Sequence, residues 1–253
     1  MLHALWTARW YWILGLFTFL IVATLQTPLH FVWPYLKPQL GPMPVQVNSV
    51  TGTLWDGQLQ LTDRTLGSVN GAWQLQPLAL LTGQLASAVQ LDAGNARMQG
   101  QLQMGSDQQL QLQEVTAFMD ASLLQPLLRR GRASLDGEFE LSGFSAQLDL
   151  TQPRLLDASG RLVFSGGAVS FPVDGKPINA ELPMLIGQLQ RDNDNITMAL
   201  TTTDGDALGQ LYLQPDGWGG TRIRRRLLDV LGQQWPAQAE ADTVIFEVSE
   251  KIL

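Results

Sequence analysis

Leucine and glutamine alternate along much of this chain, and this period of two constrains the fold more than any other feature. The alternation recurs in short runs at 58–61, 101–104, 109–113, 147–150, 188–190 and 210–214. Successive side chains of a β-strand point to opposite faces, so each run predicts a strand with one apolar and one polar face. Clusters of turn residues lie between the runs, at 92–95, 105–107, 192–195 and 204–206. Such short connections predict antiparallel neighbours in a meandering sheet.

The same pattern, extended over the whole chain, predicts a mainly β protein. We expect strands near 45–51, 53–62, 67–76, 84–92, 96–104, 109–115, 132–142, 145–151, 160–172 in pieces, 185–191, 195–203, 208–214 and 243–249. The period breaks at three places, which predict short helices at 78–81, 116–130 and 221–231. The expected fold is a single N-terminal transmembrane helix followed by an elongated, curved antiparallel sheet with two or three short helices.

The N-terminal segment predicts the membrane anchor. Residues 10–36 contain no Lys, Arg, Asp or Glu, and their apolar side chains include Tyr11, Leu14, Leu16, Phe17, Leu20, Ile21 and Leu25. As a helix this segment is long enough to cross a hydrocarbon core of about 30 Å. A cleaved signal peptide is the alternative, but the residues after the apolar run offer no A-x-A cleavage pattern.

Charge and proline positions predict the organisation around this anchor. Arg9 and the amino terminus precede it, and an acidic body follows, which favours a cytoplasmic N-terminus. Prolines make residues 37–44 a stiff connector. We therefore expect a cytoplasmic segment at 1–9, the anchor at 10–36, the connector at 37–44 and a periplasmic body at 45–253, with an internal seam near residue 131.

Composition limits the classes of partner and of chemistry. The chain carries a net charge of −7, and residues 38–253 carry 14 Lys and Arg against 23 Asp and Glu, a net −9. An acidic body argues against nucleic acid as a partner. There is no cysteine, so disulfides are excluded, while an oxidising compartment such as the periplasm is permitted.

No catalytic motif stands out. Both histidines, His3 and His30, lie in or beside the predicted anchor, which argues against a histidine-assisted nucleophile or a histidine metal site in the body. Lys176 follows a glycine but precedes Pro177, so it does not form a phosphate-binding loop. A Ser/Lys hydrolase using Lys176 is the weakest of the readings. We predict no catalytic residue, no cofactor and no metal.

Two local features are candidates for structural or binding roles. Arg222, Arg225 and Arg226 lie on the polar face of the expected helix at 221–231, where they are either solvated or contact an acidic partner or lipid phosphates. Five residues form a second motif: Gly52, Trp55, Gly57, Gly67 and Trp73. The glycines suit a strand that enters a tight turn under an indole, and Trp73 lies across from Trp55 if the two strands pair near their middles. This motif predicts a structural corner.

Segments of the chain resemble a known family. Residues 50–57, 66–77 and 80–83 are similar to the N-terminal signature of type II secretion system protein N, the GspN family, and residues 227–233 are similar to its ending. The resemblance implies a bacterial inner-membrane protein with a periplasmic β-rich body. It further implies an accessory role in the machinery that exports folded proteins across the outer membrane, with other inner-membrane and periplasmic subunits as partners.

Two readings of the function stay open. In the first, the body is an interaction protein whose strand edges and helix faces contact other secretion subunits. In the second, the sheet is a lipid- or hydrophobe-binding envelope module of the AsmA-like type, with its apolar face as an open trough. The distinguishing feature is whether helices cover the leucine face of the sheet.

Overall fold

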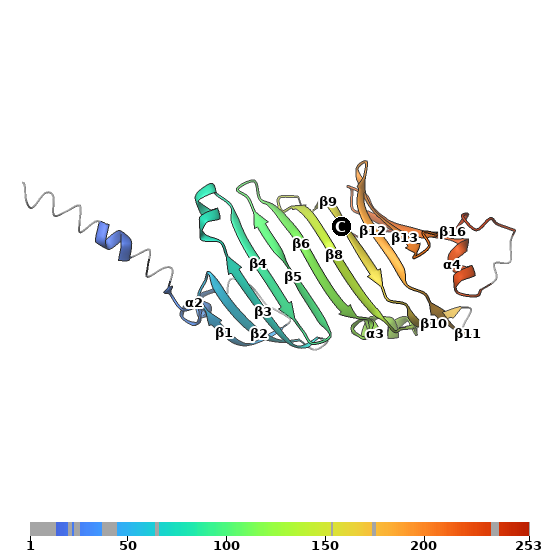
Figure 1. Ribbon diagram of the computed structural model, residues 1–253, viewed down its shortest axis with the longest axis horizontal. Helices are drawn as coiled ribbons and strands as arrows, with labels where there is room; N and C mark the ends of the chain where they lie inside the picture. Colours follow the sequence, from blue (N-terminus) through green and yellow to red (C-terminus); the bar gives the residue numbers. More distant parts are fainter. Residues whose placement is uncertain are drawn as a thin grey trace, which may run out of the picture.

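The sheet predicted from the alternation dominates the structure. The computed structural model describes residues 14–19, 22, 26–36, 45–63, 66–152, 154–173, 176–233 and 238–252. Most of them belong to a 13-stranded sheet with the order β1-β2-β3-β4-β5-β6-β8-β9-β12-β13-β14-β15-β16, and every neighbouring pair is antiparallel. A small sheet has the order β11-β10-β7. Figure 1 shows the large sheet as an elongated single layer. The mainly β prediction is confirmed.

The strands follow the predicted periods closely. In chain order they are β1 (Gln46–Gly52), β2 (Asp56–Asp63), β3 (Gly67–Leu75), β4 (Leu85–Asp92), β5 (Ala96–Met104), β6 (Gln109–Asp120), β7 (Ser134–Leu135), β8 (Glu138–Asp149), β9 (Arg154–Phe164), β10 (Gly167–Val173), β11 (Lys176–Leu182), β12 (Leu185–Asp192), β13 (Asn195–Thr202), β14 (Ala207–Leu213), β15 (Trp218–Arg224) and β16 (Val244–Lys251).

Helices are short and few among the described residues. Residues 14–19 are helical, and the named helices are α2 (Leu29–Leu36), η2 (Pro77–Thr82), η3 (Ala121–Leu124), α3 (Gln125–Leu128), η4 (Arg129–Gly131) and α4 (Arg225–Val230), where η marks a 3-10 helix. The helical turn predicted after Pro77 is confirmed as η2. Across the described residues, no helix is both long enough and apolar enough to cross a bilayer.

The register places the leucines and glutamines on opposite faces, as the alternation predicts. Leu59 pairs with Gly71, Gly71 with Leu91, and Leu91 with Met98. One residue further along each strand, the paired side chains are glutamines, asparagine and other polar groups. One face of the sheet is therefore apolar and the other polar, and we call them the apolar face and the polar face.

Two clusters of buried side chains form the core, and both lie in the C-terminal half of the sheet. The first consists of Ala146, Ala158 and Ile196 with half-buried leucines around them. The second consists of Phe164, Leu185 and Leu208, and it is covered by Leu135 and Leu182 near the small sheet and by α4. The rings of Phe139 and Phe164 pack in this second cluster with their centroids 5.0 Å apart.

The predicted helix at 116–130 is wrong over its first five residues. These residues continue β6, and helical turns begin only at Ala121, after the Asp120 carboxylate accepts a hydrogen bond from the Ser122 N–H at 2.7 Å. The cause is a bulge near Glu114, whose φ is +51°. A bulge adds one residue and shifts the period, so the segment beyond it no longer matches the alternation before it. Gly143, with φ +57°, similarly joins two predicted strands into the single strand β8.

The predicted helix at 221–231 is also shorter than expected. Residues up to Arg224 belong to β15, and α4 contains only Arg225–Val230. Gly219 and Gly220, which directly precede the predicted helix, are strand glycines of β15. A Cβ on Gly220 would lie 2.5 Å from the Tyr212 hydroxyl oxygen, and one on Gly219 would lie 2.1 Å from Ile252 Cδ1. Close neighbours, and not a helix boundary, account for both glycines.

Candidate functional site

The apolar face of β2–β6 lacks a second layer in the part of the chain that the structure describes. The helices contact the ends and rims of the sheet instead: α2 contacts β1, η2 contacts β4, α3 contacts β7, and α4 contacts β14 and β15. Side chains such as Leu59, Leu91 and Leu102 stay half-buried, and Met98 is 38 % exposed. An extended apolar surface of this kind marks a site for a protein, lipid or membrane partner.

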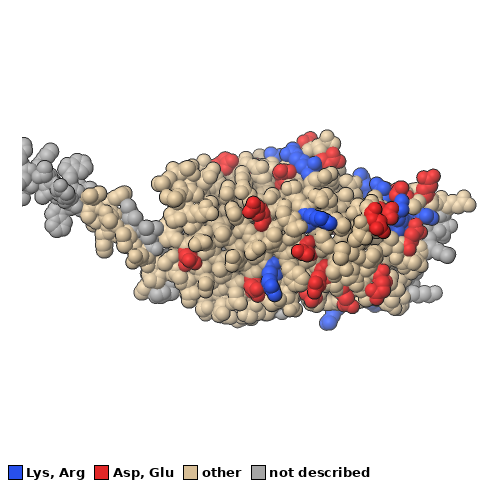
Figure 2. Space-filling model, in the orientation of Figure 1, with Lys and Arg blue, Asp and Glu red and all other residues tan. Residues whose placement is uncertain are grey.

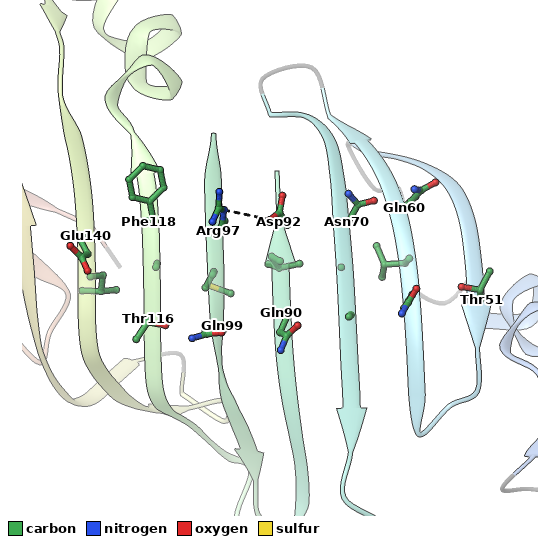
Figure 3. Close-up of a pocket in the computed structure, with 18 of the residues that line it drawn as sticks. Thr51, Gln60, Asn70, Gln90, Asp92, Arg97, Gln99, Thr116, Phe118 and Glu140 are labelled. Atoms are coloured by element: carbon green, nitrogen blue, oxygen red, sulfur yellow. Dashed lines mark ion pairs between the residues drawn. The ribbon is translucent and has the colours of Figure 1, made fainter. Parts of the chain in front are cut away.

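The polar face carries a shallow trough of about 990 Å³ over the same strands. Figure 3 shows its side chains in two rows that cross β1 to β6 and β8. One row includes Gln60, Asn70, Asp92, Arg97, Phe118 and Glu140, and the other includes Thr51, Gln90, Gln99 and Thr116. Arg97 and Asp92 form an exposed ion pair at 3.6 Å. The trough offers amides and hydroxyls to solvent, and it is the hydrated counterpart of the apolar face.

The glycine and tryptophan motif forms the corner between β1 and β2. Gly52 has φ +87°, and a Cβ there would lie 2.3 Å from the Asp56 carbonyl oxygen. The Thr53 hydroxyl accepts hydrogen bonds from the Trp55 N–H at 3.3 Å and the Asp56 N–H at 3.2 Å. These contacts close a tight turn that only glycine at position 52 fits without strain.

The two tryptophans of the motif do not pair with each other. Trp73 pairs with Gly57 and not with Trp55, and its Nε1–H donates to the Leu54 carbonyl at 3.0 Å. Its indole lies over Gly57, where a Cβ would lie 2.1 Å from the ring. The φ angle of Gly57 is not positive, so this position does not need the backbone freedom of glycine. It needs a residue without a side chain, because the indole occupies that space. Gly67, in contrast, has φ +71° and open space around it.

The arginine cluster is paired with carboxylates of its own chain, and Figure 2 shows basic and acidic side chains gathered side by side at the end of the sheet near α4 and β16. Arg222 contacts Glu247 at 2.9 Å, and Arg225 contacts Asp229 at 3.2 Å. Arg226 contacts Asp206 at 2.9 Å and Asp242 at 3.0 Å. The backbone N–H groups of Arg225 and Arg226 also donate hydrogen bonds to the backbone carbonyls of Thr243 and Ala241, respectively. These contacts hold the segment before β16 against α4, and contact with a partner stays a prediction for Arg222, Arg225 and Arg226.

The Asp242 carboxylate makes this attachment sensitive to acid. A hydrogen bond from Arg226, and then the positive charge of Arg226, lower the pKa of Asp242 below its usual value. A carboxylate with a lowered pKa stabilises the fold above its unfolded-state pKa of about 3.9, and this contribution is lost as the pH falls through the folded-state pKa.

We therefore expect Asp242→Asn to lower the melting temperature at pH 7. The difference from the wild type should shrink as the pH falls below about 4 and vanish below the lowered folded-state pKa of Asp242. Melting curves of both proteins from pH 7 to pH 2.5 measure this difference. A gap between the two curves that stays constant over the whole range would show that the ion pair contributes nothing to stability.

Residues 14–19, 22 and 26–36 of the predicted anchor fall within the described residues. Leu14, Leu16 and Phe17 lie in helical residues with exposed side chains, while Tyr11, Leu20, Ile21 and Leu25 lie outside the described residues. The end of the predicted anchor meets the corner motif: Pro28 forms a β-bridge with Thr53, and Leu29 is 2 % exposed where α2 contacts β1. The end of the predicted anchor thus lies beside the first strand of the sheet.

The described residues give no clear location for a metal site or a catalytic site. In the described ranges, no three His, Cys, Asp or Glu side chains lie close enough to hold a metal ion. The charged members of the open polar trough are the ion pair of Asp92 with Arg97 and a single glutamate, Glu140. The described residues form broad sheet faces and sheet edges, and such surfaces suit contacts with large partners.

Comparison with known proteins decides the family. The model of type II secretion system (T2SS) protein N matches residues 43–228, which run from just before β1 into α4. The chain belongs to this family. The resemblance in residues 50–57, 66–77 and 80–83 is thereby confirmed, while most of the segment 227–233 lies beyond the matched residues. The family is a component of a secretion system in the cell envelope and is not known as an enzyme. A comparison with curated proteins found no match to the sequence.

Proposed function

We propose that this family member is an accessory inner-membrane component of the type II secretion machinery that acts through protein–protein contacts. The observation that carries the proposal is the family match over residues 43–228, which include fifteen of the sixteen described strands. The edge strand β16 supports it, because a sheet edge without a cover among the described residues offers backbone groups to another polypeptide.

The proposed placement has the N-terminal residues 1–9 in the cytoplasm, an anchor at 10–36, a connector at 37–44 and the sheet in the periplasm. In this arrangement α2 and β1 lie near the membrane surface, and β16 is the strand furthest from it along the sheet. The body would then extend from the inner membrane toward the other periplasmic subunits.

Co-purification tests the proposal. The full-length chain, carrying a C-terminal tag, is purified in mild detergent from cells that express the whole secretion system. Subunits of the type II machinery should be enriched over those recovered with an unrelated single-anchor periplasmic protein. Recovery of the chain without any of these subunits, at equal expression, would contradict the proposal.

Binding of a hydrophobic ligand is the second candidate function, and the uncovered apolar face favours it. On β2–β6 this face presents leucine, methionine and valine from neighbouring strands, with no helix over it in the described part of the chain. The face begins next to α2, at the end of the predicted anchor. Acyl chains could therefore reach it from the bilayer surface without crossing water.

We expect Met98→Lys to reduce the amount of phospholipid that stays bound to the purified full-length protein, because it places a charge on the apolar face. Gln99→Lys is the matched control: it adds the same charge on the next residue of β5, whose side chain lies in the polar trough. Native mass spectrometry measures the bound lipid. Equal lipid on the wild type and both variants, or none on any of them, would contradict this second function.

A further inference from the structure

One edge strand of the large sheet, β16, is not blunted in the ways that are usual for edge strands. An exposed sheet edge presents unpaired N–H and C=O groups, and proteins usually blunt such edges with a bulge, a proline, a very short strand or a covering element. In the described part of the chain, β1 has α2 beside it and a register shift between Val47 and Ser49. In the small sheet, β7 has two residues and β11 contains Pro177.

Among the described residues, the last strand, β16, has none of these devices along most of its length. It has eight residues without proline, and its one register shift lies at its start, opposite Ile223 and Arg224. Lys251, its only lysine, is its final residue, and Glu247 is held by Arg222 at 2.9 Å. The edge is therefore long, regular and accessible.

The hydrogen-bond pattern shows which backbone groups of β16 face outward. The Ile252 N–H donates to the Gly217 carbonyl at 2.8 Å, so the backbone of residue 252 faces β15. Successive residues of a strand alternate in this respect, and the regular register from Phe246 to Lys251 carries the alternation back along the strand. The N–H and C=O groups of Glu247, Ser249 and Lys251 consequently face the free edge, at intervals of about 6.8 Å.

The side chains of β16 add an apolar row beside these groups. Val244, Phe246 and Val248 are 44 %, 54 % and 48 % exposed, and Phe246 and Val248 pair with Ile223 and Thr221 of β15. This row continues the apolar face to the end of the sheet. A partner that adds here gains main-chain hydrogen bonds from one set of residues and apolar contacts from the other.

We propose that β16 is a strand-addition site that binds an extended segment of a partner polypeptide. Only another backbone presents N–H and C=O groups at the spacing that Glu247, Ser249 and Lys251 require. The segment would have apolar side chains at alternate positions, next to Phe246 and Val248, and a basic side chain near Glu247. This inference rests on the proposed function as an interaction protein, and it names the surface. Because β16 lies beyond the matched residues 43–228, the family match does not bear on it.

A proline substitution tests the site with little effect on the fold. Ser249→Pro removes an outward N–H, and it leaves the hydrogen bonds between β15 and β16 in place. Ser249→Ala is the matched control, since it keeps the N–H. The probe is the fluorescent peptide acetyl-Lys-Val-Lys-Val-Lys-Val-Lys-amide, which places its valines beside Phe246 and Val248. In antiparallel pairing its lysine N–H groups then face β16, so the control peptide has the same charge but lysines that are methylated at the backbone nitrogen. Binding is measured by anisotropy with the full-length protein in detergent.

The peptide should bind the wild type and Ser249→Ala equally, bind Ser249→Pro about tenfold more weakly, and lose binding when N-methylated. Recovery of secretion subunits should fall in parallel for Ser249→Pro. Unchanged peptide binding and unchanged recovery, with wild-type melting, would overturn the site but leave the proposed function intact. Failure of the wild type to recover any subunit would instead contradict the proposed function.

Two further measurements complete the test. If Ser249→Pro melts well below the wild type, Lys251→Pro replaces it, because residue 251 is the last outward-facing position and lies at the end of the strand. Sedimentation of the wild type and Ser249→Pro shows whether β16 pairs with a second copy. A dimer that Ser249→Pro abolishes would overturn the assignment to a different partner protein.

Discussion

Gly57→Val is expected to lower the free energy of unfolding by about 3 kcal/mol, because the position lies directly under the indole of Trp73. A Cβ at residue 57 would be 2.1 Å from the ring, far inside van der Waals contact. The ring has little freedom to move, since its Nε1–H is fixed to the Leu54 carbonyl at 3.0 Å. Chemical denaturation of the wild type and the variant measures the difference.

A second substitution separates this clash from a general intolerance of side chains. Adding Trp73→Leu to Gly57→Val removes the ring, so the double variant should be less destabilised than the two single effects added together. Strict additivity, or wild-type stability of Gly57→Val itself, would contradict the contact between Gly57 and Trp73 as the basis of the corner.

Leu208→Ala is expected to cost about 3 kcal/mol, because it opens a cavity in the second core cluster. Leu208 is fully buried, with 0 % exposure, between Phe164, Leu185 and the side chains of α4. The loss should lower the melting temperature by roughly 9 °C for a chain of this size.

The control for this cavity lies on the same strand. Leu211 belongs to β14 as well, but it is 38 % exposed on the apolar face, so Leu211→Ala should cost about 1 kcal/mol. Equal melting temperatures for Leu208→Ala and Leu211→Ala would show that α4 and the small sheet do not seal this end of the sheet.

The strands were predictable because the alternation has a direct physical cause. A strand in a single-layer sheet has one apolar and one hydrated face, so its sequence records the period of two. The prediction is accurate from β1 to β5 and again from β12 to β14. Its errors cluster where backbone geometry changes the period, at Glu114 and Gly143, both with positive φ. β11 and β15 were not predicted as separate strands, since both carry too little alternation to be recognised.

The site was predictable in kind but not in detail. Glycines at 52 and 57 predicted a corner, but the sequence could not show that Gly57 exists to accommodate the Trp73 ring. The arginines suggested a solvated helix face, whereas their partners, such as Asp242 and Glu247, follow much later in the chain and come close only through the pairing of β15 with β16. The alternation of apolar and polar residues also predicted β16. The sequence does not show, however, which strand lies at the edge of the sheet.

Secretion by living cells tests the central claim most directly. A strain that lacks this chain is compared with the same strain carrying the wild-type copy, and the distribution of a folded type II substrate between periplasm and medium is measured. The account predicts that the deletion raises the periplasmic share and lowers the secreted share, and that the wild-type copy restores both. An unchanged distribution in the deletion strain, with the substrate folded and the other subunits at normal levels, would contradict a role in type II secretion.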